Sequence, residues 1–122
     1  KPGKKIERII LSTGKIFYDL SDYRVNNKIE NAALLRIEQL YPLNRKLLLE
    51  LLTQYSDAKK LVWCQEESQN MGAWTYIAPL LEEISGQKPF YAGRDASASP
   101  AVGSLAIHKI EQAALVETAF LG

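Results

Sequence analysis

Cysteine and histidine are almost missing from this chain, whose 122 residues include only Cys64 and His108. A single cysteine excludes a disulfide within the chain, and one histidine beside it excludes the usual Cys/His zinc arrangements. A Ser-His-Asp triad would have to be built on His108 alone. We therefore expect no metal site, and the free cysteine without an export signal favours a reducing compartment.

Long apolar runs and an excess of one charge are also missing. The leucine run Leu47–Leu49 is far shorter than the roughly 20 residues that span a bilayer. The apolar Ile9–Leu11 is too short for a signal-peptide core. Lys and Arg number 15 against 14 Asp and Glu, whereas a general nucleic-acid binder needs a concentrated basic surface. We expect neither a membrane nor a nucleic-acid partner.

Strand-like and helix-like segments alternate along a chain that is 47% hydrophobic and 24% charged, as in one globular domain. The patterns predict strands at 8–12, 32–37, 61–64 and 89–92, and helices at 15–26, 44–55, 74–84 and 100–120. The run 32–37 is apolar enough for a strand covered on both faces. This alternation predicts an α/β fold with a mainly parallel sheet between two layers of helices.

Helix ends and breaks have their own signals. Ser12 or Thr13 is the predicted N-cap of the first helix, Asn44 that of the second, and Ser99, before a proline, that of the last. Pro79 lies inside the third predicted helix, where we expect a kink or a break.

Ligands of such sheets bind beyond the carboxyl ends of the strands, which here lead into residues 12–15, 38–40, 65–68 and 93–99. The first of these loops lacks Walker spacing, so we interpret it as a helix-capping turn. Glu66 and Glu67 point to opposite faces of an extended segment, so a cap or a salt bridge is favoured over an acid–base pair. Cys64 is expected to be buried and inert, without pairing with His108 as a nucleophile.

Arginine, small residues, hydroxyls and a helix start come together in 93–99, which are the ingredients of an anion site. The sequence predicts that this edge binds a phosphate group of an effector through the following residues: Thr13, Lys15, Arg36, Gln65, Arg94, Ser97 and Ser99. The alternative is that Arg94 pairs with Asp95 or another carboxylate as part of the scaffold.

Longer motifs add a resemblance. The runs LLRIEQLYP (34–42), VWCQEE (62–67), NMGAW (70–74) and YAGRDASASPAVG (91–103), preceded by STGKIFY (12–18), stand in this order along nearly the whole chain. Together they resemble the C-terminal domain of the thiamine-dependent 2-oxoglutarate dehydrogenase component. More widely, the chain is similar to the C-terminal domain of transketolase.

The resemblance implies a fold and a domain division. It implies a three-layer α/β/α domain with a mixed, mostly parallel five-stranded sheet in which one strand is antiparallel. The fifth strand is expected near residues 40–44 or near the N-terminus. Residues 1–5 are interpreted as a linker and residues 6–122 as the transketolase C-terminal-like domain. The linker-like start, without methionine, indicates a piece of a longer protein.

The resemblance also implies a parent reaction, the decarboxylation of 2-oxoglutarate on thiamine diphosphate with Mg²⁺. Succinyl transfer to the lipoyl group of the partner dihydrolipoyl succinyltransferase follows, within the tricarboxylic acid cycle. The cofactor is implied to lie in the preceding domains of a homodimeric enzyme, so the fragment is expected to hold no catalytic residue, to bind no cofactor and to be inactive alone. The expected location is the cytoplasm of a bacterium, or the mitochondrial matrix of a eukaryote.

Two classes of function remain open. One, which the resemblance implies, is an accessory domain that supports dimer assembly and binds a regulatory effector such as a nucleotide or an acyl-CoA. The other is a stand-alone module that uses the same fold to bind a small anion or a nucleotide.

Overall fold

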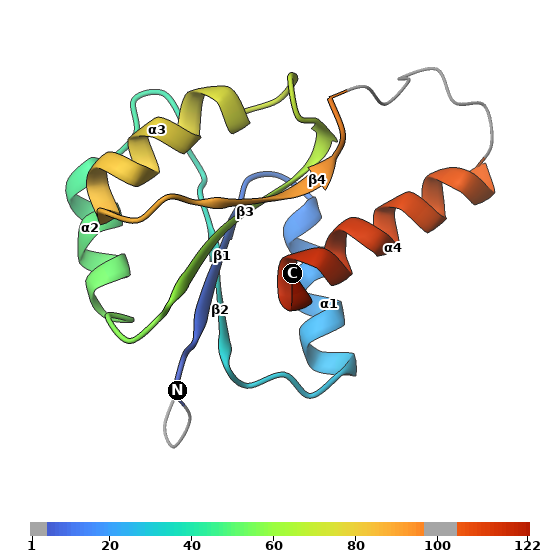
Figure 1. The fold of residues 1–122 in the computed structure, drawn as a ribbon, viewed down its shortest axis with the longest axis horizontal. Helices are drawn as coiled ribbons and strands as arrows, with labels where there is room; N and C mark the ends of the chain where they lie inside the picture. The colour runs from blue at the N-terminus through green and yellow to red at the C-terminus, as the bar shows by residue number, and fades with distance from the viewer. Residues whose placement is uncertain (1–4, 97–104) are drawn as a thin grey trace.

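Strands and helices alternate strictly in the computed structural model, which describes residues 5–96 and 105–122 (Figure 1). The strands are β1 (Arg8–Ser12), β2 (Ala32–Arg36), β3 (Lys60–Ser68) and β4 (Phe90–Arg94). The helices are α1 (Ile16–Asn26), α2 (Arg45–Thr53), α3 (Trp74–Ser85) and α4 (Leu105–Leu121). The predicted order of elements is therefore confirmed, although Ser99 and its proline lie outside the described residues.

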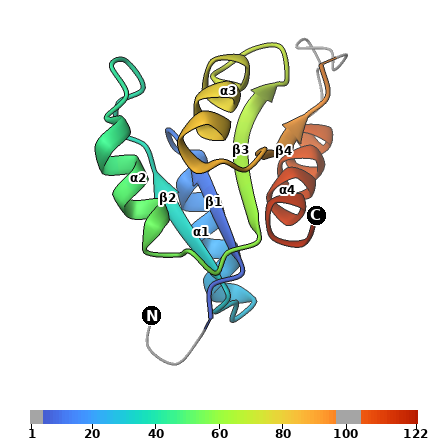
Figure 2. The ribbon, with the colours of Figure 1, turned by 60° about the vertical axis from the view of Figure 1, so that its left-hand side comes forward.

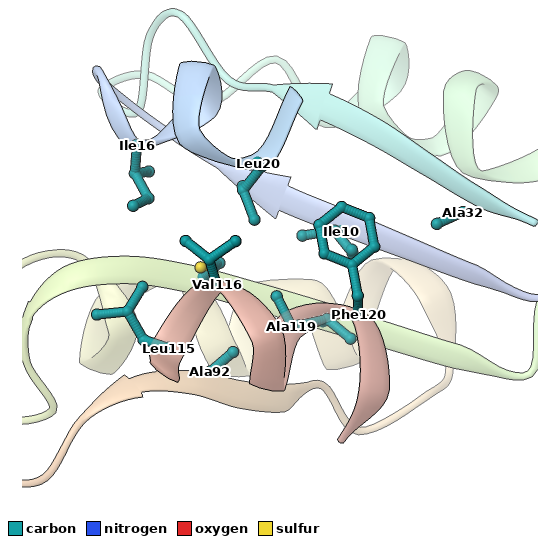
Figure 3. Close-up of a cluster of buried hydrophobic side chains, with 11 residues drawn as sticks. Ile10, Ile16, Leu20, Ala32, Ala92, Leu115, Val116, Ala119 and Phe120 are labelled. Carbon is teal, nitrogen blue, oxygen red and sulfur yellow. The ribbon is translucent and has the colours of Figure 1, made fainter. Parts of the chain in front are cut away.

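The sheet has the strand order β2-β1-β3-β4, and every pair of neighbouring strands is parallel. Helices α1 and α4 cover one face and α2 and α3 cover the other, as the two ribbon views show (Figures 1 and 2). Each face has its own apolar core, one around Leu20 and Val116 and the other around Trp63 and Leu81. Figure 3 shows the first, in which Val116 and Phe120 of α4 lie opposite Leu20 of α1. The three-layer arrangement is confirmed.

The sheet differs from the expected one in its strand number. The described residues form four strands and none of them is antiparallel, so the mixed five-stranded sheet is not seen in this part of the chain. Residues 40–44 form a turn with a cis Tyr41–Pro42 bond, and Glu7 extends the parallel pairing of β1 through bonds to Asn31 and Lys59. Strand β2 is consequently an edge strand, and Leu34 and Leu35 are only half-buried.

Local signals at helix ends are partly confirmed. Asn44 caps α2, accepting a hydrogen bond from Leu47 N at 3.0 Å. The expected cap of α1 is wrong, because Thr13 Oγ1 donates instead to the Ile37 carbonyl at 2.7 Å and Ser12 Oγ is buried without a partner among the described residues. Of the kink or break expected at Pro79, the break does not occur, since α3 continues through the proline. A proline removes one backbone hydrogen bond, and the fully buried Ile77 and Leu81 hold the helix on both sides of it.

Strands β3 and β4 run further than predicted, through Ser68 and Arg94, which pair with each other beyond an irregularity in the register. Side chains alternate between the faces along β3. Trp63 belongs to the core beneath α2 and α3, whereas Cys64 belongs to the core beneath α1 and α4. This alternation decides which functional side chains can meet.

Gln65 is the polar centre of the α3 side of the sheet and is only 3% exposed. Its Oε1 accepts hydrogen bonds from Trp63 Nε1 at 2.9 Å and from Trp74 N, the first residue of α3, at 3.0 Å. Its Nε2 donates to the carbonyls of Glu67, Ser68 and Met71 at 3.2, 2.9 and 2.9 Å. One buried amide therefore ties the end of β3, the following loop and the start of α3 together.

Replacing this amide by an apolar side chain of similar size is expected to be costly. Gln65→Leu leaves the Trp63 indole N–H and several backbone groups unpaired, so we expect a loss of roughly 2–5 kcal/mol in the free energy of unfolding. Urea unfolding followed by tryptophan fluorescence measures it. The matched Gln54→Leu variant, at an exposed position, should change stability by less than about 0.5 kcal/mol. Equal stabilities of the two variants would contradict this role of Gln65.

Cys64 is fully buried, and loss of solvation raises the pKa of its thiol to about 12. Because only the thiolate reacts, we expect thiol reagents at about pH 8 to label the native protein only through unfolding, at a rate that rises with added urea. Cys64→Ser should cost on the order of 1–3 kcal/mol, since a hydroxyl replaces a thiol in an apolar core. Fast labelling of the native protein, at the rate of the urea-unfolded chain, would overturn this expectation.

Candidate functional site

Polar side chains meet at the carboxyl edge of the sheet, on the face that α1 and α4 cover. They come from the β1–α1 turn, α1, β3, β4 and α4, and hydrogen bonds join them into one carboxyl-edge network. Its members are Lys15, Asp19, Glu66, Arg94, His108, Glu111 and Gln112.

Arg94, at the end of β4, is the best buried cation of the network, with a side chain 14% exposed. Its Nη1 forms an ion pair with Glu111 of α4, and its Nε donates to the Glu66 carbonyl at 2.9 Å. Its Nη2 donates to Gln112 Oε1 at 3.3 Å and lies 3.3 Å from His108 Nδ1. A guanidinium only donates, so this last contact is a hydrogen bond when the proton of a neutral His108 is on Nε2. Every nitrogen of Arg94 thus faces a protein acceptor.

Glu66 joins the other half of the network. Its Oε1 accepts from Lys15 Nζ at 2.7 Å and from Gln112 Nε2 at 3.2 Å, and Gln112 also donates to Asp19 Oδ2 at 2.9 Å. The hydrogen bond and the charge of Glu66 raise the pKa of the Lys15 ammonium, which is 81% exposed. The interpretation of Glu66 as a salt-bridge residue is confirmed.

Among the predicted effector residues that the structure describes, Lys15 and Arg94 alone lie in this network. Thr13 is bonded to the Ile37 carbonyl. Arg36 lies on the edge strand, with its guanidinium 5.2 Å from the Tyr18 ring, a hydrogen bond to Tyr18 Oη at 3.2 Å and its Nε 3.8 Å from Glu38 Oε2.

Another predicted residue, Gln65, is not brought to this edge. The amide of Gln65 faces α3, on the opposite side of the sheet, and its bonding groups are occupied. Ser97 and Ser99 lie outside the described residues.

The network contains functional partners that the sequence analysis missed. Glu111 and Gln112 follow His108 by three and four residues on α4, so the three side chains share one helical face. This spacing in the sequence could have indicated that Glu111 and Gln112 lie beside His108. The four-residue spacing of Lys15 and Asp19 could likewise have indicated that these two side chains are neighbours.

The pair of Cys64 and His108 considered in the sequence analysis is not brought together. Cys64 faces a closed core, whereas His108 is exposed on α4 beside Arg94. Within residues 5–96 and 105–122, no three His, Cys, Asp or Glu side chains are grouped so that they could hold a metal ion. In the same ranges, no helix has the length and apolar character needed to cross a membrane.

A groove of about 390 Å³ lies beside Arg94, lined among others by Asp95 and Glu111. Two carboxylates and one already paired guanidinium give this groove a negative formal charge. An anion that binds here must therefore compete with Glu111 for Arg94.

Comparisons with known proteins agree over nearly the whole chain. Residues 1–120 match the family model described as 2-oxoglutarate dehydrogenase C-terminal. The 2-oxoglutarate dehydrogenase E1 component of Cupriavidus necator is 46% identical over 120 residues, which are 97% of this chain and 13% of that protein. The corresponding component of Rickettsia conorii is 46% identical over 119 residues, 93% of this chain and 13% of that protein. The 2-oxoglutarate dehydrogenase E1 component of Brucella anthropi is 45% identical over 121 residues, which are 94% of this chain and 12% of that protein. The chain thus spans 12–13% of the length of these relatives.

A solved structure gives the same answer for the fold. The chain is similar to a structure titled "Split gene transketolase, inactive beta4 tetramer", with a TM-score of 0.67 and 16% identity over 96% of this chain and 38% of that one. At this identity the likeness shows the fold, which is transketolase-like as expected. From the match over residues 1–120 and these relatives, the chain belongs to the family of 2-oxoglutarate dehydrogenase C-terminal domains.

Proposed function

We propose that these residues serve a longer 2-oxoglutarate dehydrogenase E1 polypeptide as a non-catalytic domain that supports its assembly. The proposed parent decarboxylates 2-oxoglutarate with thiamine diphosphate and Mg²⁺ and passes the succinyl group to the lipoyl group of dihydrolipoyl succinyltransferase. The support for this is a family match that covers the chain but only 12–13% of its relatives' length. The homodimer and the preceding domains of the same chain are the proposed partners.

The observation that carries the non-catalytic role is that the candidate reactive groups among the described residues already serve structural contacts. Glu66 and Arg94 connect α4 with the sheet, His108 contacts Arg94, and Cys64 lies in the core with a raised pKa. The described residues offer no cluster of side-chain donors for Mg²⁺, so they do not fit thiamine diphosphate with its metal ion. These side chains stabilise a fold.

A regulatory role at the carboxyl edge is the second proposal, and Lys15 favours it. Its ammonium is 81% exposed and precedes α1, whose N-terminal N–H groups attract negative charge. A phosphate of a nucleotide or an acyl-CoA would bind Lys15 and replace Glu111 on Arg94. The same residues would serve a stand-alone anion-binding module, so the upstream gene sequence separates the two functions.

The first test is cofactor binding by the 122-residue chain. We expect calorimetry with thiamine diphosphate and Mg²⁺ to give no heat of binding, and the chain to release no CO₂ from 2-oxoglutarate, because its residues do not supply the required groups. A full-length relative, such as the Cupriavidus necator component, serves as the positive control. Micromolar binding of the cofactor to this chain would contradict the proposed non-catalytic role.

The second test is effector binding at Arg94. Arg94→Ala should weaken binding of AMP or acetyl-CoA by roughly 1.5–3 kcal/mol, the range for a hydrogen bond to a charged group. Backbone amide shifts measure the affinity. Arg45→Ala, which breaks the exposed pair with Glu83 on the other face, is the control and should leave it unchanged. The regulatory proposal fails if the amides of Lys15 and Arg94 do not move at millimolar ligand.

A further inference from the structure

Helix α4 is anchored in the core only by its last turns. Its buried side chains are Leu115, Val116, Ala119 and Phe120. Residues 105–114 contain no buried side chain, and Leu105 and Ile110 are 69% and 68% exposed. At 1.5 Å per residue this half of the helix is roughly 15 Å long. In Figure 1 it extends away from the sheet.

The exposed half of α4 is also unusually apolar for a surface helix. The charged residues of the whole helix are Lys109, Glu111 and Glu117, and Glu111 is paired with Arg94. Ala106, Ile110 and Ala114 follow one another at four-residue spacing along the side that faces away from the core. The polar side chains of this segment, His108, Lys109, Glu111 and Gln112, lie on the other side. An apolar stripe on a helix normally faces a packed surface, whereas this one is exposed.

The carboxyl-edge network holds this segment in a defined direction. Arg94 bonds to Glu111 and Gln112, and Gln112 in turn reaches Asp19 on α1 and Glu66 on β3. These contacts lie within the exposed half of α4, close to its buried end. The apolar side chains are thus presented on a helix whose orientation is fixed from two other elements, which lowers the entropic cost of docking.

We propose that residues 105–114, the α4 docking face, pack against a part of the same polypeptide that lies outside these 122 residues. This inference rests on the proposed function. The chain spans 12–13% of its relatives' length, so most of such a polypeptide would be tethered to this face. Tethering raises the effective concentration of the partner surface without any new contact. The partner surface is apolar at its centre.

Charge distinguishes this occupant from a second copy of the chain. The docking face carries Lys109, and its one carboxylate, Glu111, already bonds to Arg94. A two-fold pair of these faces would bring two lysines together without a carboxylate to balance them, because an isologous interface uses the same patch twice. The proposed partner therefore has an acidic side chain at the rim of its apolar surface, where it meets Lys109.

Hydrogen exchange in the full-length polypeptide and in the 122-residue chain tests the proposal. We expect the amides of residues 105–114 to exchange at least about tenfold more slowly in the full-length polypeptide, at every protein concentration. The double substitution Leu105→Lys and Ile110→Lys should remove this protection and leave the exchange of the 122-residue chain unchanged. Val25→Lys, at a position on α1 that is 68% exposed, is the matched control and should change neither.

Two outcomes overturn the docking face. Equal exchange of residues 105–114 in both proteins shows that no part of the polypeptide outside the 122 residues covers them. Protection that appears in the 122-residue chain and rises with its concentration shows that a second copy covers them instead. Decarboxylation of 2-oxoglutarate by the same full-length preparation is measured in parallel. Its absence counts against the proposed function, whereas equal exchange in an active preparation counts against the docking face alone.

Discussion

The amide of Gln65 is the constraint on which the carboxyl edge of this domain depends. It is buried and makes five hydrogen bonds, two through its oxygen and three through its nitrogen. Buried polar groups stabilise a structure only when they are satisfied, so the loop after β3 has to place its carbonyls around this nitrogen. Gly72 meets that requirement with a φ of +67°, where a Cβ would lie 3.2 Å from the Gln65 amide nitrogen.

The next residue along β3 organises the opposite face. Glu66 turns toward α1 and α4, where its carboxylate holds Lys15 and Gln112 and its carbonyl accepts from Arg94. Two consecutive residues of one strand thus fix helices on both sides of the sheet. The alternation of side chains along an extended strand makes this division unavoidable, and a one-residue shift in register would exchange the two roles.

Local patterns were enough to predict much of the fold. Apolar periodicity placed the elements in their order, and Asn44 was identified as a cap because the contact it makes is only three residues long. The end of β3 was mistaken for a loop, since Gln65 is polar and its bonds to Met71 and Trp74 form only after the chain has turned. The edge position of β2 could not be predicted from its apolar run, because it depends on the order of the strands in the sheet.

The site was less predictable than the fold, for a similar reason. Arg94 was identified as the central cation, but its acceptors come from β3 and α4 and become neighbours only in the folded sheet. Lys15 could be placed beside it because both follow parallel strands, whose carboxyl ends share an edge. Thr13 and Arg36 satisfy the same rule and still lie outside the network, since a shared edge does not determine which way a side chain turns.

The two proposals for this domain meet at Glu111. The carboxylate pairs with Arg94 and belongs to the helix that carries the α4 docking face. An anion that replaces Glu111 on Arg94 removes one of the contacts that set the direction of α4, and a partner packed on residues 105–114 also acts on that direction. If both proposals hold, binding at the two places is thermodynamically linked, and each ligand must alter the affinity for the other by the same factor. The sign of this coupling follows from which direction of α4 the partner surface accepts.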